Sequence, residues 1–154
     1  MKPLLVGESN PYQADSRMAM RYALHPDPPR ASGGRLCFVV MGLDEQTYLR
    51  SFDRINLCHP RWSLPAARSH ASDLVASRGV EDVLVLCGAK VAAAFGLPST
   101  PFVIYGGCHG RSVHVAGPSR VVLPHPSGLN RAWHQPGAVQ QARAVLREVG
   151  ALPL

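Results

Sequence analysis

The sequence has no long hydrophobic run, and this absence limits where the protein can reside. No apolar stretch approaches the roughly 18 residues that a membrane-spanning helix requires. The apolar start of the chain is interrupted by Gly7 and Glu8, which leaves it too short for a signal peptide. We therefore expect an intracellular, cytoplasmic protein with no membrane partner.

The sequence also has no closely spaced pair of cysteines. Its four cysteines, Cys37, Cys58, Cys87 and Cys108, lie far apart, each in or beside an apolar run. Without a Cys-x-x-Cys pair a metal site is not predicted, and intracellular chains rarely build a disulfide framework. We expect buried free thiols and no bound metal.

Lysine is scarce, because 14 of the 16 basic residues are arginine. The net charge is still +6, and such an excess favours an anionic partner, of which nucleic acid is the commonest. A bias toward arginine can also follow from base composition, and no run of five or six like charges marks a basic tail. The charge permits DNA binding without demonstrating it.

Strand and helix patterns alternate along the 154 residues, a length that suits a single domain over residues 1–154. Apolar runs predict buried strands at 3–6, 54–57, 82–87 and 120–123, and helical patterns cover about 14–22, 44–53 (capped by Asp44), 65–77, 89–95 and 137–149. Residues 36–40 predict a short strand or extended segment, and 101–105 with 112–116 predict a hairpin. The alternation predicts a three-layer α/β/α sandwich with a mostly parallel central sheet.

His125 stands between two prolines on the loop that leaves the last predicted strand. Ligands of open α/β sheets bind outside the carboxyl ends of the strands. Each proline fixes its own φ and restricts the residue before it, so the loop is a rigid mount for an imidazole. Pro, Ser and Gly are also ordinary turn residues, so the loop by itself leaves a plain strand-to-helix turn open.

Polar side chains follow other predicted strands as well. Asn10 and Tyr12 lie after the first strand, and Asn56 lies at the exit of the next. Because a parallel sheet brings strand exits to one edge, we expect these three residues and His125 to line a single pocket.

Four motifs in this order resemble those of the uracil-DNA glycosylase superfamily, over nearly the whole chain. Residues 7–12 are similar to its first motif, in which a carboxylate or amide follows Gly and precedes Pro-Tyr, with one residue more. Residues 36–40, 55–57 and 125–127 are similar to its later motifs. Residues 127–131 are most similar to the mismatch-specific branch.

The resemblance implies a uracil-DNA glycosylase-like fold and a role for each motif residue. Phe38 would stack on a flipped base, Asn56 would read its polar edge, and Tyr12 would exclude thymine. His125 would donate to a base oxygen, and Leu129 would enter the duplex as a wedge. The expected DNA contacts are Ser127, Gly128, Leu129, Asn130, Arg131 and Arg61.

The chemistry of base removal asks for the same kinds of residue. The base leaves as an anion and the sugar becomes positive, so the site needs a donor at a base oxygen and an oriented water. A duplex base must also be extruded, which needs a wedge and a stacking face. Each assigned residue has a structural alternative. Phe38 could belong to the core, Leu129 could anchor the next helix, Asn56 could cap a loop, and Arg61 and Arg131 could be solvated surface.

The first motif leaves the water-handling residue open. Counted back from Pro11 the position falls on Asn10, and counted forward from Gly7 it falls on Glu8. An amide could only orient water, whereas a carboxylate could also stabilise the sugar cation. The adjoining Pro-Tyr pair favours Asn10, and Glu8 stays the alternative.

We therefore expect a monomeric, monofunctional DNA glycosylase of base excision repair, acting on uracil or a related base. No lysine stands in the three loops, so lyase chemistry is not expected. We expect no cofactor, and no iron-sulfur cluster such as some branches carry, because two closely spaced N-terminal cysteines are missing. The alternatives are an enzyme of the same fold acting on a hypermodified base or a free nucleoside or nucleotide, and a non-catalytic nucleic-acid-binding module.

Overall fold

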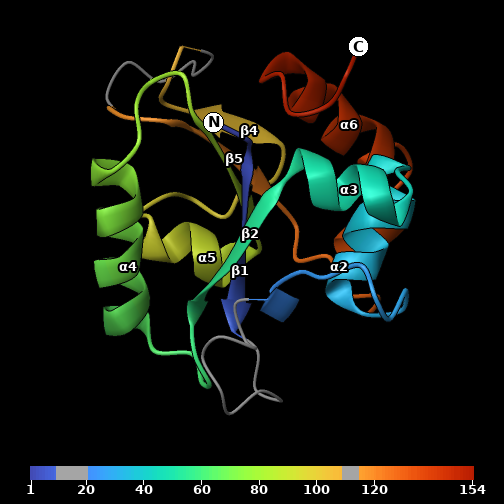
Figure 1. The fold of residues 1–154 in the computed structure, drawn as a ribbon, viewed down its shortest axis with the longest axis horizontal. Helices are drawn as coiled ribbons and strands as arrows, with labels where there is room; N and C mark the ends of the chain where they lie inside the picture. Colours follow the sequence, from blue (N-terminus) through green and yellow to red (C-terminus); the bar gives the residue numbers. More distant parts are fainter. Residues whose placement is uncertain (10–20, 109–114) are drawn as a thin grey trace.

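A five-stranded sheet forms the centre of the computed structural model, which describes residues 1–9, 21–108 and 115–154 (Figure 1). The strands are β1 (Leu4–Ser9), β2 (Asp53–Cys58), β3 (Val83–Cys87), β4 (Val103–Tyr105) and β5 (Ser119–Leu123). Their order is β2-β1-β3-β5-β4, and all neighbours are parallel except β4 and β5. The predicted α/β fold with a mostly parallel sheet is confirmed.

The middle strands are largely apolar because both of their faces are covered. Every residue of β3 and β5 is buried, and Val85 of β3 pairs with Leu5 on one side and Val121 on the other. A parallel strand packed on both faces needs such a continuous apolar run. The first two strands extend further than predicted, so Gly7, Glu8 and Asn56 lie within strands and not in exit loops.

Helices cover both faces of the sheet (Figure 1). On one face α4 (Leu64–Ala76) and α5 (Ala89–Ala94) pack against Leu4 and Val6. On the other face lie η1 (Arg35–Met41), α3 (Glu45–Ser51) and α6 (Ala138–Glu148), with a core that includes Leu5, Val40 and Leu146. Two short elements, α2 (Ser32–Gly34) and η2 (Arg131–His134), precede η1 and α6. None of the helices in the described ranges is long and apolar enough to cross a membrane.

Residues 36–40 are helical, so the strand or extended segment predicted there is wrong. They belong to η1, a π-helix that closes at Gly42 with a left-handed φ of 69°. Within it Phe38 and Val39 are exposed between buried pairs of residues on either side, which is a helical pattern. A short apolar run does not distinguish strand from helix, and the chain before it decides here. Gly33 and Gly34 pass so close to the backbone of His25 and Pro29 that a Cβ would clash.

The antiparallel partner of β4 is β5, and not residues 112–116 as the predicted hairpin required. Val103 pairs with Val122, and Tyr105 pairs with Arg120. Residues 112–114 lie outside the described residues, and Val115 and Ala116 are not in a strand. Glycines with positive φ at both ends of this connection let the chain turn tightly and return along β4.

The helix boundaries follow local capping signals. The Asp44 side chain accepts a hydrogen bond from the Thr47 backbone at 2.9 Å and caps α3, as predicted. This helix ends two residues early because Phe52 is already extended. Ser63 caps α4, and Gly96 follows α5 with a left-handed φ of 70°. The helix predicted over 14–22 lies almost wholly outside the described residues.

Candidate active site

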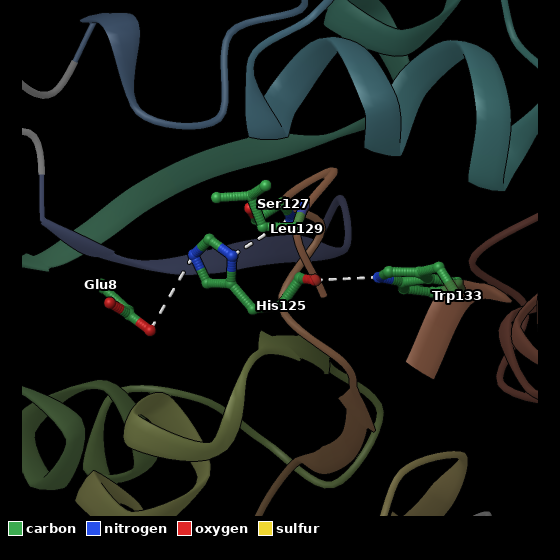
Figure 2. A network of polar contacts seen from close by, with 5 residues as sticks. All are labelled: Glu8, His125, Ser127, Leu129 and Trp133. Carbon is green, nitrogen blue, oxygen red and sulfur yellow. Dashed lines mark hydrogen bonds and ion pairs between the residues drawn. The ribbon is translucent and has the colours of Figure 1, made fainter. Parts of the chain in front are cut away.

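Glu8, Asn56 and His125 gather at the carboxyl edge of the parallel strands. Glu8 lies near the end of β1, Asn56 lies near the end of β2, and His125 follows β5 by two residues. Figure 2 shows Glu8 and His125 directed toward each other, with 3.9 Å between a carboxylate oxygen and Nε2. Parallel strands bring these positions to one edge. Strand alternation turns Glu8 and Asn56 to opposite faces of the sheet, so the expected pocket shared by Asn56 and His125 stays a prediction.

The His125 loop fixes both the position and the tautomer of the imidazole. The Ser127 backbone N–H donates to Nδ1 at 3.2 Å, so Nδ1 is the acceptor and the ring proton sits on Nε2. The indole Nε1 of Trp133 donates to the His125 carbonyl at 2.8 Å (Figure 2). Both flanking prolines are buried. The imidazole therefore presents an N–H donor toward Glu8 from a backbone that is held at both ends.

The contact between Glu8 and His125 is an approach and not a closed hydrogen bond. A distance of 3.9 Å exceeds hydrogen-bond range, so the Nε2 proton stays available to another acceptor. Both side chains are partly open to solvent, at 32% for His125 and 24% for Glu8.

Gly88 makes room for His125, and the sequence analysis did not identify it as a site residue. It joins β3 to α5 with a φ of 111°, a conformation that disfavours any residue with a side chain. A Cβ here would lie 3.2 Å from the His125 Cβ and 3.5 Å from a Glu8 carboxylate oxygen. The strand-Gly-helix pattern at a sheet edge is the signal that could have pointed to it.

Asn56 reaches across the neighbouring strand instead of capping a loop. It pairs in register with Gly7 of β1, and its Oδ1 lies where a Cβ on Gly7 would stand. Leu24 packs on the same spot. Ile55 and Leu57 pack toward α4 and α5, so Asn56 faces the η1 side of the sheet. Any side chain at residue 7 would displace the amide.

The loop after His125 presents Leu129 to solvent. Leu129 is 93% exposed, which rules out the alternative that it anchors the following helix. The Ser127 hydroxyl accepts from the Leu129 N–H at 3.2 Å, and the Asn130 side chain accepts from the Ala132 N–H at 3.0 Å. These two bonds hold the loop on either side of an exposed apolar side chain.

Arg35 lies beside this loop and was not predicted as a site residue. A Cβ on Gly128 would stand 3.5 Å from the Arg35 guanidinium. The Arg35 Nε is buried and has no hydrogen-bond partner among the described residues. Arg35 is the first residue of η1, so the mistaken strand assignment concealed its position.

The remaining predicted residues are exposed or lie outside the described ranges. Phe38 is 40% exposed on η1, so it is not a core residue. Arg61 and Arg131 are exposed on the loop after β2 and on η2. No hydrogen bond or ion pair within the described part of the chain joins these three residues to Glu8 or His125. Asn10 and Tyr12 lie outside the described residues.

The cysteines are free thiols, and three of them are buried as predicted. Cys108 is exposed, which corrects the prediction for that residue, because it follows β4 at the start of a surface turn. Burial raises the pKa of Cys37 to about 11 and that of Cys87 to about 12. Over residues 1–9, 21–108 and 115–154, no group of three or more His, Cys, Asp or Glu side chains could hold a metal ion.

No protein-family model, curated protein or solved structure matches this chain. The resemblance to the uracil-DNA glycosylase superfamily therefore stays a prediction based on four short motifs. Of the residues in those motifs, the described part of the structure brings Glu8, Asn56 and His125 to one edge.

Proposed function

We propose that this chain is a monofunctional DNA glycosylase, with a three-layer α/β/α fold of the uracil-DNA glycosylase type, that removes uracil or a related base. The observation that carries the proposal is the His125 imidazole. Its Nδ1 is held as an acceptor, so Nε2 offers a proton 3.9 Å from the Glu8 carboxylate. A fixed hydrogen-bond donor can stabilise the negative charge that develops on the leaving base, and a neighbouring carboxylate can stabilise the positive charge that develops on the sugar.

In the proposed reaction the electron pair of the glycosidic bond leaves with the base. The Nε2–H of His125 stabilises the resulting anion by donating to a base oxygen. Water then forms the new bond to the sugar carbon and gives up one proton, which neutralises the released base anion. The register of the first motif assigns this water to Asn10, and the contact with His125 favours Glu8, whose carboxylate also stabilises the sugar cation.

The exposed loop supplies the DNA-binding part of the proposal. Leu129 is suited to fill the gap that a flipped base leaves, because its side chain is almost fully exposed on a loop held by Ser127 and Asn130. Phe38 would stack on the base, and Asn56 would bind its polar edge through both donor and acceptor atoms. The net charge of +6 favours the phosphate backbone as partner.

Base release from labelled oligonucleotides tests the catalytic assignment. The substrates carry uracil, hydroxymethyluracil, hypoxanthine, xanthine or thymine in single and double strands. We expect His125→Ala to lower turnover about 100-fold or more, the usual effect of losing a donor to a developing anion. His134→Ala, at an exposed histidine on η2, is the matched control and should behave as wild type.

A second pair of variants identifies which residue positions the attacking water. Loss of turnover in Asn10→Ala with activity kept in Glu8→Gln assigns it to Asn10, and the reverse pattern assigns it to Glu8. Activity unchanged in the His125 variant refutes the proposed mechanism. DNA binding without release of any base would favour the non-catalytic module, and release from nucleosides alone would favour the small-molecule enzyme.

Leu129→Ala tests the wedge separately. Because Leu129 is 93% exposed, its truncation should leave the free energy of unfolding unchanged. We expect turnover to fall on duplex DNA and to stay near wild type on single strands, where no gap has to be filled. An equal loss on both substrates would contradict a wedge.

A further inference from the structure

A pocket lies on the α4 and α5 side of the sheet, and His125 is not among its lining residues. Its volume is about 750 Å³, within the range of small-molecule sites. The lining comes from the second half of α4, the end of α5 and the segment before β5, and it includes Val75, Phe95 and Leu97. Arg120 and His125 are five residues apart, roughly 16 Å at strand rise.

Arg120 brings a buried positive charge to this pocket. It lies on β5 two residues before Val122, on the face that α4 and α5 cover, and it is 4% exposed. One of its Nη atoms donates to the Ala116 carbonyl, and its Nε has no hydrogen-bond partner among the described residues. Gly117 lets the chain close over the guanidinium, because a Cβ there would stand 2.9 Å from an Nη.

No acidic side chain balances this charge within the part of the chain that the structure describes. The pocket lining contains two arginines, Arg120 and the exposed Arg68 of α4, and no Asp or Glu. Burial lowers the pKa of Arg120 below its usual value, although a guanidinium stays protonated at neutral pH. A buried charge without an oppositely charged group beside it is unfavourable, and an anion in the pocket would lower this energetic cost.

We propose that this pocket binds a small organic anion, with its carboxylate or phosphate on Arg120 and Arg68 and its apolar body against Val75, Phe95 and Leu97. The apolar lining favours an aromatic or aliphatic body over a bare inorganic ion. The site is separate from the proposed glycosylase site and does not depend on that function.

Fluorescence titration with anilinonaphthalene sulfonate, an aromatic anion, is the first test. We expect saturable binding that Arg68→Ala weakens about tenfold, as the loss of one charge-assisted hydrogen bond predicts. Arg50→Ala removes the same charge from an exposed site on α3, across the sheet, and should leave the affinity unchanged. Equal affinity in wild type and Arg68→Ala would overturn the proposal.

Competition identifies the charged group that the pocket prefers. Phenyl phosphate and phenylacetate share an aromatic ring and differ in their anion, whereas benzyl alcohol is uncharged. We expect at least one anion to displace the dye and benzyl alcohol to leave it bound. Displacement by benzyl alcohol as effective as that by the anions would show a merely apolar site and refute the proposal.

A blocking variant guards against dye that binds elsewhere. Ala76→Trp places an indole in the pocket from an exposed position of α4, and should abolish dye binding. Ala93→Trp, at an exposed position of α5 outside the lining, is its control. Arg120→Met should also abolish binding if thermal unfolding shows that it folds. Dye binding retained in Ala76→Trp overturns the assignment whether or not Arg120→Met folds.

Discussion

Replacing Trp133 by Phe removes the hydrogen bond that holds the backbone of His125. The indole Nε1–H of Trp133 donates to the His125 carbonyl at 2.8 Å, and phenylalanine has no such donor. The aromatic contact of Trp133 with Phe102, at 6.1 Å between ring centroids, is of a kind that phenylalanine can also make. Trp62→Phe is the matched control, because Trp62 packs against the α4 and α5 core and no hydrogen bond of its indole is found in the described ranges.

The magnitude follows from a single hydrogen bond at a partly buried site. Its loss should lower the free energy of unfolding by about 1 kcal/mol beyond the loss in Trp62→Phe. For a chain of this length that difference lowers the melting temperature by about 2–4 °C. Since the same bond restrains the mount of the imidazole, we also expect base release to fall roughly tenfold, equivalent to about 1.4 kcal/mol in the barrier.

Urea unfolding and single-turnover base release measure the two effects on the same pair of variants. Equal stability of Trp133→Phe and Trp62→Phe would refute the structural part of the reasoning. A stability difference with unchanged base release would refute the link from the Trp133 bond to catalysis and leave the fold argument intact.

Gly88→Ala adds a Cβ 3.2 Å from His125 at a φ of 111°, so we expect base release to be lost. The control Gly96→Ala adds a Cβ with no atom within 4 Å, also at a positive φ of 70°, and should keep base release. Equal activities of the two variants would contradict this expectation. A thiol reagent at pH 8 should label the exposed Cys108 rapidly and the three buried thiols only after unfolding. Burial also raises the pKa of Cys37 to about 11 and that of Cys87 to about 12, which slows their reaction. Cys108→Ser should abolish the fast labelling phase, and a fast phase that remains in this variant would disprove the assignment. Hydrogen bonds from Thr47 lower the pKa of Asp44 below its usual value, so the Asp44 carboxylate stabilises the fold above about pH 4 and this stabilisation is lost as the pH falls further. Urea unfolding should therefore show that the free energy of unfolding depends less on acid pH in Asp44→Ala than in wild type. An unaltered pH dependence would argue against this role of Asp44.

Much of the fold could be predicted because its signals are local. The runs at 82–87 and 120–123 are apolar at every residue but their first, which is typical of a strand covered on both faces. Asp44 marked the start of α3 through its own side chain. The sequence also predicted that Asn56 and His125 lie toward the carboxyl edge of the sheet, because parallel strands end at one edge, whereas their sharing one pocket stays a prediction.

The errors arose where contacts outside the apolar run decide its conformation. Residues 36–40 form η1 because Gly33 and Gly34 pass against the backbone of the loop before them, a contact that no pattern within the run encodes. The pairing of β4 with β5 depended on how the chain returned after its turn. Both choices are set by tertiary packing, which overrides short apolar runs.

The sequence by itself determined which residues carry polar chemistry and near which strands they lie, because strand propensity and turn residues act over a few positions. Only the tertiary structure decided how the site is held. The Trp133 bond to His125, the space left by Gly88 and the approach of Arg35 to Gly128 all join residues from different elements. Such contacts depend on side chains meeting across the folded chain, and spacing along the sequence does not record them.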